Sequence, residues 1–339
     1  MSDVARRAGV HAATVSRALR NDPRITPEQR ARIRRVVAEL GYRTNPLVAA
    51  LMSTRRSGRA PAFQSTLGYI TKYAPEQAVA FARNYSELIV GARDRALSQG
   101  YQIEEINLHN PAFTPRRITE ILHSRGIHGL LIAPLHSVYE SVDLDWTQFG
   151  AVAVGYSFGH VPVNRVSHNH FTAFGLAARN CREAGARRLG LVLQKRVHEK
   201  VKKGWVAGAL LDQSEQPVAD RVPPLLLDEL SEQKFSAWFR RYRPEVVLGV
   251  NMTTILGWLK KLGRAVPRDT GFVSLDRRPV DRGIAGISQD YANLGRCAAD
   301  FLVSLLHRNE RGLPQAPVTL LVDGVWISDR TFRTRSAPQ

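Results

Sequence analysis

The sequence predicts a small all-α unit followed by a larger α/β region made of two similar lobes with parallel sheets. The first 65 residues carry the start and stop signals of short helices and no strand pattern. From Thr66 onward, short apolar runs alternate with amphipathic stretches, which is typical of parallel strands joined by helical crossovers. A chain of 339 residues also exceeds the size that one core usually supports, so two or more packed units are expected.

The first two helices of the N-terminal unit are short and joined by a tight turn. Residues 3–8 are expected to form the first helix, Gly9 to take the turn, and residues 12–20 to form the second. Ala5 and Val15 are placed to pack these helices against each other. This arrangement predicts a helix-turn-helix, although two short helices around a glycine also occur in ordinary helical bundles.

Two further helices begin with capping signals. Thr26 is the expected N-cap of a third helix that runs to Leu40, with Pro27 at its first position. The dipeptide "NP" repeats the signal, so Asn45 is expected to start a fourth, very short helix. Residues 53–65 are polar, basic and interrupted by Gly and Pro, which indicates a linker.

Beyond the linker, two series of alternating elements suggest two similar halves joined near residues 158–165. Apolar runs such as "TLGYIT", "GLLIAP", "LGLVL" and "VVLGV" predict buried strands. The helices between them are expected at residues 83–99, 115–125, 172–185, 200–213, 231–241, 254–263 and 291–307.

Composition limits the classes of protein that the sequence allows. No run approaches the roughly 18 apolar residues of a membrane span, and the start lacks the order of a signal peptide, so a cytoplasmic protein is expected. Cys181 and Cys297 lie far apart in apolar helical settings, which favours buried free thiols. No nucleophile, base and oxyanion set is visible, and neither an enzyme nor a bound cofactor is expected.

The positive charge is concentrated at the N-terminus. The whole chain has a formal net charge of +18, and residues 1–60 hold 13 Arg against 4 acidic residues, or 13 − 4 = +9. Arginine has the planar side chain that suits phosphates and guanine edges. Charge alone would still allow RNA, an acidic membrane or an acidic protein as the partner.

The stretch "DVARRAGVHAATVSRALRNDPRITPEQRARIRRVVAELGYRTNP" resembles the DNA-binding headpiece of the lactose-repressor (LacI/GalR) family of bacterial transcription regulators. Later stretches, "LGRAVPRDTGFVSLDRRP" and "GISQDYANLGRCAADFL", are similar to the effector domain of that family. The resemblance implies a homodimer that binds a double-stranded operator. It also implies a periplasmic-binding-protein-like effector domain whose lobes exchange the chain three times around a small molecule.

The resemblance implies domain boundaries as well. Residues 1–44 would form the headpiece, 45–65 the hinge helix and linker, and 66–339 the effector-binding and dimerisation domain. Within that domain the N-lobe is expected at about 66–160 and 288–318, and the C-lobe at about 161–287 and 319–335.

The same resemblance implies which headpiece residues contact the operator. Ala12 and Ala13 occupy the specificity positions, where they either touch thymine methyl groups or simply favour the helix. Arg17 would read guanine, and Thr14 and Ser16 would hold phosphates. The remaining arginines are expected on a solvated basic face that attracts phosphates without reading bases: Arg6, Arg7, Arg30, Arg32, Arg34, Arg35 and Arg43.

The short helix after Asn45 gives the apolar Leu51 a possible role. So short a helix is marginal by itself in water. By resemblance to the family's hinge, two copies would pair through Val48 and Met52 while Leu51 wedges into the minor groove. The alternative is that Leu51 docks against the protein's own body.

The effector pocket departs from the family pattern. Asn169-His170 stand where an Asp-Asn pair is usual, Val201 replaces an arginine, and Met252 replaces an aspartate, so a standard hexose effector is doubtful. The motif "HNH" around Asn169 also suggests a metal pair, but further ligands are not visible near it, and no metal is expected. The expected pocket residues are Tyr73, Asn169, Trp205, Asn251, Asp276 and Gln289.

Some of these residues have plainer interpretations. Trp205 could serve helix packing, and Asp276 could cap a helix or pair with an arginine. The favoured function is a dimeric repressor of a palindromic operator, controlled by a sugar or sugar derivative. The alternative is an activator or a general DNA-binding protein with an altered or non-functional pocket.

Overall fold

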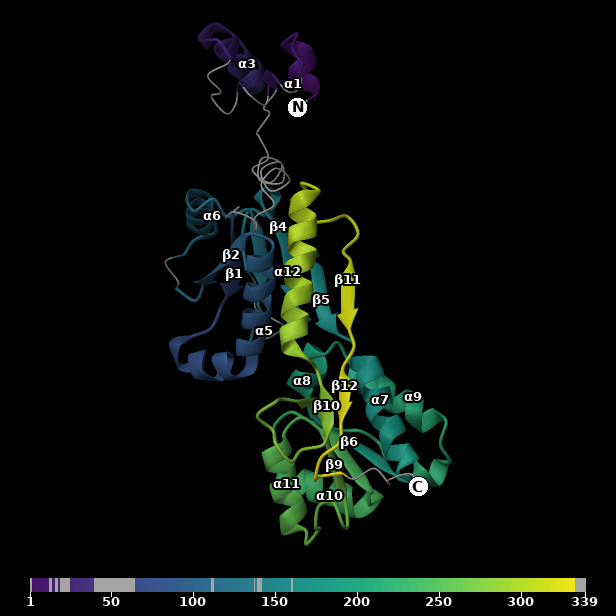
Figure 1. Cartoon of the computed structure of the whole chain (residues 1–339). Coiled ribbons are helices and arrows are strands. Elements are labelled where there is room, and N and C mark those ends of the chain that lie inside the picture. Colours follow the sequence, from purple (N-terminus) through teal and green to yellow (C-terminus); the bar gives the residue numbers. More distant parts are fainter. Residues whose placement is uncertain are drawn as a thin grey trace. The chain divides into compact units, whose positions relative to one another are not determined.

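The protein consists of two compact units, Met1–Gln64 and Ser65–Gln339 (Figure 1). The computed structural model describes the following residues: 2–11, 14, 15, 18, 25–39, 65–110, 113–136, 138, 142–159 and 161–332. The predicted hinge helix and linker therefore lie outside the described residues, except for Ser65.

The first unit begins with α1 (Ser2–Arg7), which ends in a tight glycine turn. Gly9 has a φ of 60°, in the left-handed region that glycine adopts without strain. The amide of Val10 donates to the carbonyl of Ala5 at 3.0 Å, and the amide of Gly9 to that of Arg6 at 3.3 Å. This pair of bonds is a Schellman C-cap, so the expected turn at Gly9 is confirmed.

The next described helix, α3 (Pro27–Glu39), starts where the capping signal predicts. The hydroxyl of Thr26 accepts a hydrogen bond from the amide of Gln29 at 3.3 Å. Ile33 is fully buried and Val36 nearly so, which gives the helix one apolar face. The core of the unit contains the expected contact partners Ala5 and Val15; its members are Val4, Ala5, Ala8, Val15, Ala18, Ile25, Ile33 and Val36.

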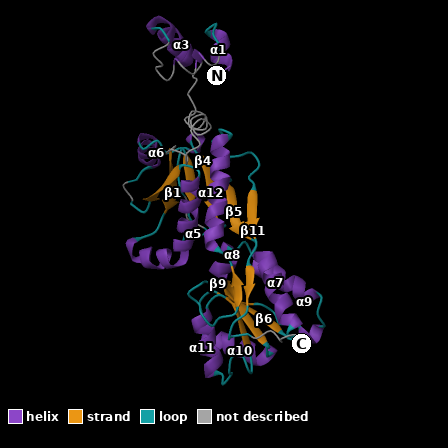
Figure 2. Ribbon diagram, in the orientation of Figure 1, coloured by secondary structure: helices purple, strands orange, loops and turns teal. Residues whose placement is uncertain are grey.

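The second unit contains two six-stranded sheets, each forming the centre of a lobe (Figure 2). The first lobe has a sheet in the order β11-β5-β4-β3-β1-β2, with all pairs parallel. Its strands are β1 (Ser65–Thr71), β2 (Tyr101–Asn107), β3 (Gly129–Ile132), β4 (Gly150–Val154), β5 (Asn164–His168) and β11 (Thr319–Val322). Its helices are η1 (Pro75–Gln77), α5 (Ala78–Ser98), α6 (Pro115–Ser124), η2 (Trp146–Gln148) and α12 (Tyr291–His307).

The second lobe has a sheet in the order β12-β10-β9-β8-β6-β7, antiparallel only where β12 pairs with β10 among the described strands. Its strands are β6 (Leu189–Gln194), β7 (Leu225–Leu227), β8 (Val246–Gly249), β9 (Gly271–Arg277), β10 (Gly286–Ser288) and β12 (Val325–Ile327). Its helices are α7 (His170–Glu183), α8 (Lys195–Lys200), α9 (Gly204–Ser214), η3 (Val218–Asp220), α10 (Glu232–Tyr242) and α11 (Met252–Lys261).

The inner strands β6 and β8 of the second sheet are apolar on both faces because helices cover both. Leu191 belongs to the cluster that contains α7 and α9, whereas its neighbour Val192 belongs to the cluster that contains α10 and α11. Leu248 and Val247 divide in the same way. Since successive side chains point to opposite faces of a strand, unbroken apolar runs such as "LGLVL" are those of buried parallel strands.

The chain crosses between the lobes three times within the described residues: between β5 and α7, between β10 and α12, and between β11 and β12. Figure 1 shows the last crossing as the yellow chain that runs from β11 to β12. Two of these crossings were expected near residues 160 and 318, which is one strand before the places where the chain crosses in the structure. Both β5 and β11 remain in the first sheet because they pair with each other in parallel, Val166 opposite Leu320.

Several predicted elements differ in extent. The helix expected at 83–99 begins at Ala78, and the one expected at 200–213 is two helices, α8 and α9. Lys202 and Lys203 separate them with φ values of 48° and 64°, which no helix allows. The strands β5, β10 and β12 were not predicted, because they are short and adjoin the crossings rather than forming distinct apolar runs.

A close helix pair holds the first lobe together. Helices α5 and α12 lie side by side (Figure 1), and glycines are placed where they meet. A Cβ on Gly295 would lie 2.8 Å from the amide nitrogen of Ala92, and a Cβ on Gly91 would lie 2.8 Å from the Cα of Ala292. The backbones therefore approach more closely than a pair of side-chain-bearing residues permits.

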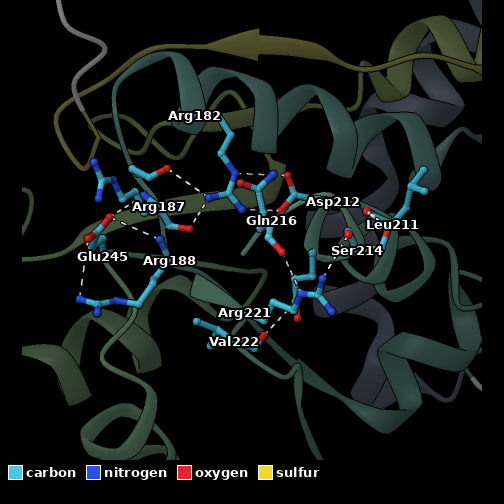
Figure 3. A network of polar contacts seen from close by, with 12 residues as sticks. Arg182, Arg187, Arg188, Leu211, Asp212, Ser214, Gln216, Arg221, Val222 and Glu245 are labelled. Carbon is cyan, nitrogen blue, oxygen red and sulfur yellow. Dashed lines mark hydrogen bonds and ion pairs between the residues drawn. The ribbon is translucent and has the colours of Figure 1, made fainter. Parts of the chain in front are cut away.

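In the second lobe, a polar network joins α7 to α9 and to the sheet (Figure 3). The Nη2 atom of Arg182 donates to Asp212 at 2.7 Å, and its Nε donates to the other carboxylate oxygen at 3.3 Å. Glu245 accepts a hydrogen bond from the amide of Arg187 at 2.6 Å. The pair Arg182–Asp212 is mostly buried and bidentate, so it fixes the relative position of the two helices.

Cys181 is buried and Cys297 is partly buried, and both are free thiols as expected. Burial raises the pKa of Cys181 to about 12, so its thiol remains protonated and unreactive. No described helix combines the length and apolarity that a membrane crossing requires.

Candidate effector site

A cavity of about 300 Å³ lies between the carboxyl ends of the strands of both lobes. In parallel sheets these ends are where ligands usually bind, because the loops that follow the strands converge there. The first lobe contributes Tyr85, Pro134, Val154, Gly155, Tyr156, Ser157, Ser167, His168, Tyr291 and Leu294. The second lobe contributes His170, Gln194, Arg196, Val197, Lys200, Val201, Trp205, Val250, Asn251, Asp276 and Arg278.

Aromatic rings make up much of the cavity wall. Within the lobes, the ring of His168 lies 4.7 Å from that of Tyr291, edge to face, and the ring of His170 lies 4.9 Å from that of Trp205. Across the lobes, the ring of His168 lies 5.9 Å from that of His170. Tyr156 of the first lobe has its ring centre 5.5 Å from the Nζ of Lys202 in the second. These contacts provide flat faces against which a ring-shaped ligand could stack.

The two histidines of the wall are neutral. Burial lowers the pKa of His168 to about 3, and the nearby charge of Arg278 adds to the effect. Burial also lowers the pKa of His170 to about 3, assisted by His168. The Nε2 of His168 and the Nδ1 of His170 have no hydrogen-bond partner among the described residues, and a bound molecule could supply one.

Asp276 is held by two other residues of the wall. One of its oxygens lies 3.2 Å from the Nε of Arg278. The other accepts hydrogen bonds from the Nη2 of Arg278 and from the hydroxyl of Tyr291, each at 3.2 Å. The guanidinium carbon of Arg278 also lies 3.5 Å from the ring centre of Tyr291. Burial, followed by the charge of Asp276, raises the pKa of Tyr291 well above its ordinary value, so its hydroxyl remains a donor.

The structure brings together three of the six predicted pocket residues: Trp205, Asn251 and Asp276. The indole nitrogen of Trp205 is buried without a hydrogen-bond partner in the described part of the chain. Trp205 also belongs to the second-lobe core, so it packs the helix as well as lining the cavity. Asp276 pairs with an arginine, which was the alternative considered for it.

The other three predicted pocket residues do not line the cavity. Tyr73 donates its hydroxyl to Glu105 at 3.0 Å. Asn169 caps α7 by accepting from the amide of Thr172 at 3.4 Å. Gln289 is buried and donates to the carbonyl of Leu275 at 2.8 Å, which ties the second crossing to β9.

Sequence reasoning missed several residues of the wall. Three positively charged residues line the cavity, Arg196, Lys200 and Arg278, and Tyr85, Tyr156 and Tyr291 supply rings. Tyr156 and Arg278 come directly after apolar strands, a position that could have marked them. The motif "HNH" contributes its two histidines to the cavity, and the described residues bring together no group of three or more metal-ligating side chains.

Most predicted DNA contacts lie outside the described residues: Ala12, Ala13, Ser16, Arg17, Asn45 and Leu51. Thr14 is described, helical and partly exposed, and its amide donates to the carbonyl of His11 at 2.8 Å. Arg6, Arg7, Arg32 and Arg35 are exposed as expected. Arg30 differs, because it is half-buried and its guanidinium donates to the carbonyl of Ile25 at 3.0 Å.

These features define a class of protein: a helical unit of the helix-turn-helix type joined to a two-lobed α/β unit with a cavity between its lobes. The family model described as "Bacterial regulatory proteins, lacI family" matches residues 1–45. The catabolite control protein A of Staphylococcus xylosus is 30% identical over 129 residues, which are 38% of this chain and 35% of that protein. The match thus spans about a third of that relative's length.

Solved structures show the same fold over almost the whole chain. The transcriptional regulator CelR, in complex with cellobiose, is 19% identical, covers 97% of this chain and 98% of its own, and has a TM-score of 0.58. The lac repressor dimer bound to operator and the anti-inducer ONPF is 19% identical, covers 97% of each chain, and has a TM-score of 0.55. Residues 1–45 are thus similar to the lacI family of regulators, and the chain shares the fold of these two solved regulators.

Proposed function

We propose that this protein is a sequence-specific DNA-binding transcriptional regulator that represses from a palindromic operator as a homodimer, under the control of a small-molecule effector. The observation that carries the proposal is the capped Gly9 turn between α1 and the helical residues Thr14, Val15 and Ala18, in the stretch that matches the lacI family model. Its exposed arginines suit a phosphate backbone.

An apolar stripe on α5 supports the homodimer. Val79, Val90 and Leu97 are 81%, 52% and 65% exposed. They are 11 and 7 residues apart, so at 3.6 residues per turn they lie within about 20° of one line along the helix. Exposed apolar residues in register on one helix are typical of an interface, and a second copy of the chain offers the same stripe.

Contacts across the cavity support control by an effector. Lys202 and Arg278 of the second lobe lie over the rings of Tyr156 and Tyr291 of the first. A ligand that enters between these side chains changes the contacts that hold the lobes at one angle. It would shift the protein between two states, to the extent that it binds one of them more tightly.

The test starts with selection of binding sites from random DNA by the full-length protein, followed by footprinting. One palindromic site supports a specific regulator, whereas broad coverage of any sequence supports the general DNA-binding alternative and contradicts the proposal. Arg17→Ala should cost about 1–3 kcal/mol and relax the preference at one base pair. As a control, Arg32→Ala should weaken binding to all sequences equally and reduce the salt dependence.

The hinge is tested separately by Leu51→Ala. If Leu51 inserts between base pairs, the variant should bind the selected operator more weakly and bend it less. Circularly permuted DNA fragments report the bend angle in gel-shift experiments. Unchanged affinity together with an unchanged bend would contradict the wedge and favour docking of Leu51 on the protein itself. Reporter expression with and without the protein in cells then separates repression from activation.

A further inference from the structure

The charges of the cavity wall do not balance. Its basic residues are Arg196, Lys200 and Arg278, and Asp276 is the one acidic residue among the described lining residues. Both histidines are neutral near pH 7, so the formal charge is 3 − 1 = +2. A cavity partly shielded from water concentrates the field of such a charge, which favours an anion.

The single carboxylate, Asp276, is paired with the positively charged Arg278. Both oxygens of Asp276 lie 3.2 Å from nitrogens of Arg278, and one of them also accepts from Tyr291. Neutral sugars are commonly held by carboxylates that accept hydrogen bonds from hydroxyl groups. The Oδ1 atom of Asp276 has no hydrogen-bond partner among the described residues and could accept one from a ligand, but the pair with Arg278 leaves Asp276 without a net negative charge to repel an anion.

The wall contains further donors besides this pair. Trp205 is only 2% exposed, and its indole N–H has no hydrogen-bond partner among the described residues. Arg196 lies on the same α8 helix as Lys200, and its Nη2 donates to the side-chain oxygen of Gln194 at 3.1 Å. An indole donor and two cations on neighbouring turns can bind the oxygens of an acid group together.

The rest of the wall fits a single ring. Tyr85, Tyr156, Tyr291 and Trp205 present aromatic rings, and the volume of about 300 Å³ is at the lower end of the range of ligand pockets. We infer that the cavity binds a small ring-shaped anion, with its carboxylate or phosphate group between Arg196, Lys200 and Trp205 and its ring against the tyrosines. This inference rests on the proposed function, since it names the chemical class of the effector.

The experiment compares matched pairs of compounds on the full-length protein by isothermal titration calorimetry. Glucuronate and glucose 6-phosphate are each compared with glucose, and benzoate with benzyl alcohol. At least one anion should bind tenfold or more tightly than its neutral partner, and its affinity should fall as salt is added. Binding of the sugar acids or of benzoate shows whether the ring is a sugar or an aromatic ring. Comparison of glucuronate with glucose 6-phosphate shows whether the acid group is a carboxylate or a phosphate.

Variants place the anion in the cavity. Arg196→Gln and Lys200→Gln should each weaken its binding about tenfold while leaving the neutral compound unaffected. Lys195→Gln is the matched control, because Lys195 lies on the same helix but pairs with Asp228 outside the cavity wall. Equal loss in all three variants would mean diffuse attraction to a highly basic protein and would overturn the inference.

The outcomes also separate this inference from the proposed function. Binding of glucose as tight as that of glucuronate, or no binding of any anion at millimolar concentration, overturns the anion inference. If glucose then changes operator affinity, the proposed regulatory function stands although the anion inference is wrong. If an anion binds in the cavity but operator affinity does not respond, the inference about the ligand stands and effector control is contradicted.

Discussion

The close contact between α5 and α12 predicts that the variant Gly295→Ala is less stable than the natural protein. A Cβ at this position would lie 2.8 Å from the amide nitrogen of Ala92, where ordinary contacts begin at 3.4 Å. The shortfall against this nitrogen is 3.4 − 2.8 = 0.6 Å, and the added Cβ would lie closer still to the carbonyl oxygen of Leu88. Both neighbours are backbone atoms that cannot rotate away, so the helices must separate.

The magnitude follows from two opposing effects. Overpacking of a close contact costs about 3 kcal/mol at the upper end of its usual range. Alanine recovers about 1 kcal/mol because it favours the helix over glycine. The net loss should be about 2 kcal/mol, or a fall in Tm of roughly 4–8 °C for a unit of this size.

Gly175→Ala on α7 is the matched control. The change is the same and the position is also helical, but Gly175 is exposed and no described atom lies within 4 Å of the added Cβ. It should raise stability by up to about 1 kcal/mol. Thermal unfolding followed by circular dichroism measures both variants. If Gly295→Ala unfolds at the same or a higher temperature than the natural protein, the close helix contact is refuted.

Two further predictions concern pH and assembly. Since burial lowers the pKa of His168 and His170 to about 3 while the unfolded chain keeps values near 6.5, their contribution to stability is fully present above about pH 6.5 and is lost as pH falls toward 3. Between pH 7 and 5.5 the free energy of unfolding, measured with urea, should fall by about 2 kcal/mol. A His168→Asn/His170→Asn variant should lose this pH dependence; if it keeps it, the two histidines are not its source. Val90→Asp should weaken self-association about tenfold or more in sedimentation experiments, because burying a valine is worth about 1.5–3 kcal/mol. Val218→Asp, at a position 78% exposed on η3, should leave it unchanged, and an equal effect of both would argue against the α5 interface.

The local signals of this sequence were sufficient for the helices of the first unit and for most elements of the lobes. Gly9 and Thr26 act through bonds to residues three to five positions away, so the pattern of letters contains what the turn and the cap need. Helix α12 was predicted with its observed bounds, because its apolar face repeats with the helical period over 17 residues. The two-lobed organisation followed from the alternation of runs and from the family resemblance.

The crossings were harder to predict, because short strands are defined by their partners. β5 joins the first sheet through β4 and β11, and β11 is more than 150 residues away along the chain. No window of sequence contains both strands of that pair. The division between lobes therefore shifted by one strand at two of the three crossings.

The pocket shows the same limit for single residues. Trp205, Asn251 and Asp276 were placed correctly in the cavity wall, whereas Gln289 turned out to hold a crossing in place and Tyr73 to pair with Glu105. The sequence alone determined the class of fold and the basic helical head, because these depend on composition, local periodicity and motif. Only the tertiary structure decided that Asp276 is neutralised and that Arg196 and Lys200 face the same cavity, because charge balance in a pocket depends on which distant side chains the fold brings within a few ångströms of one another.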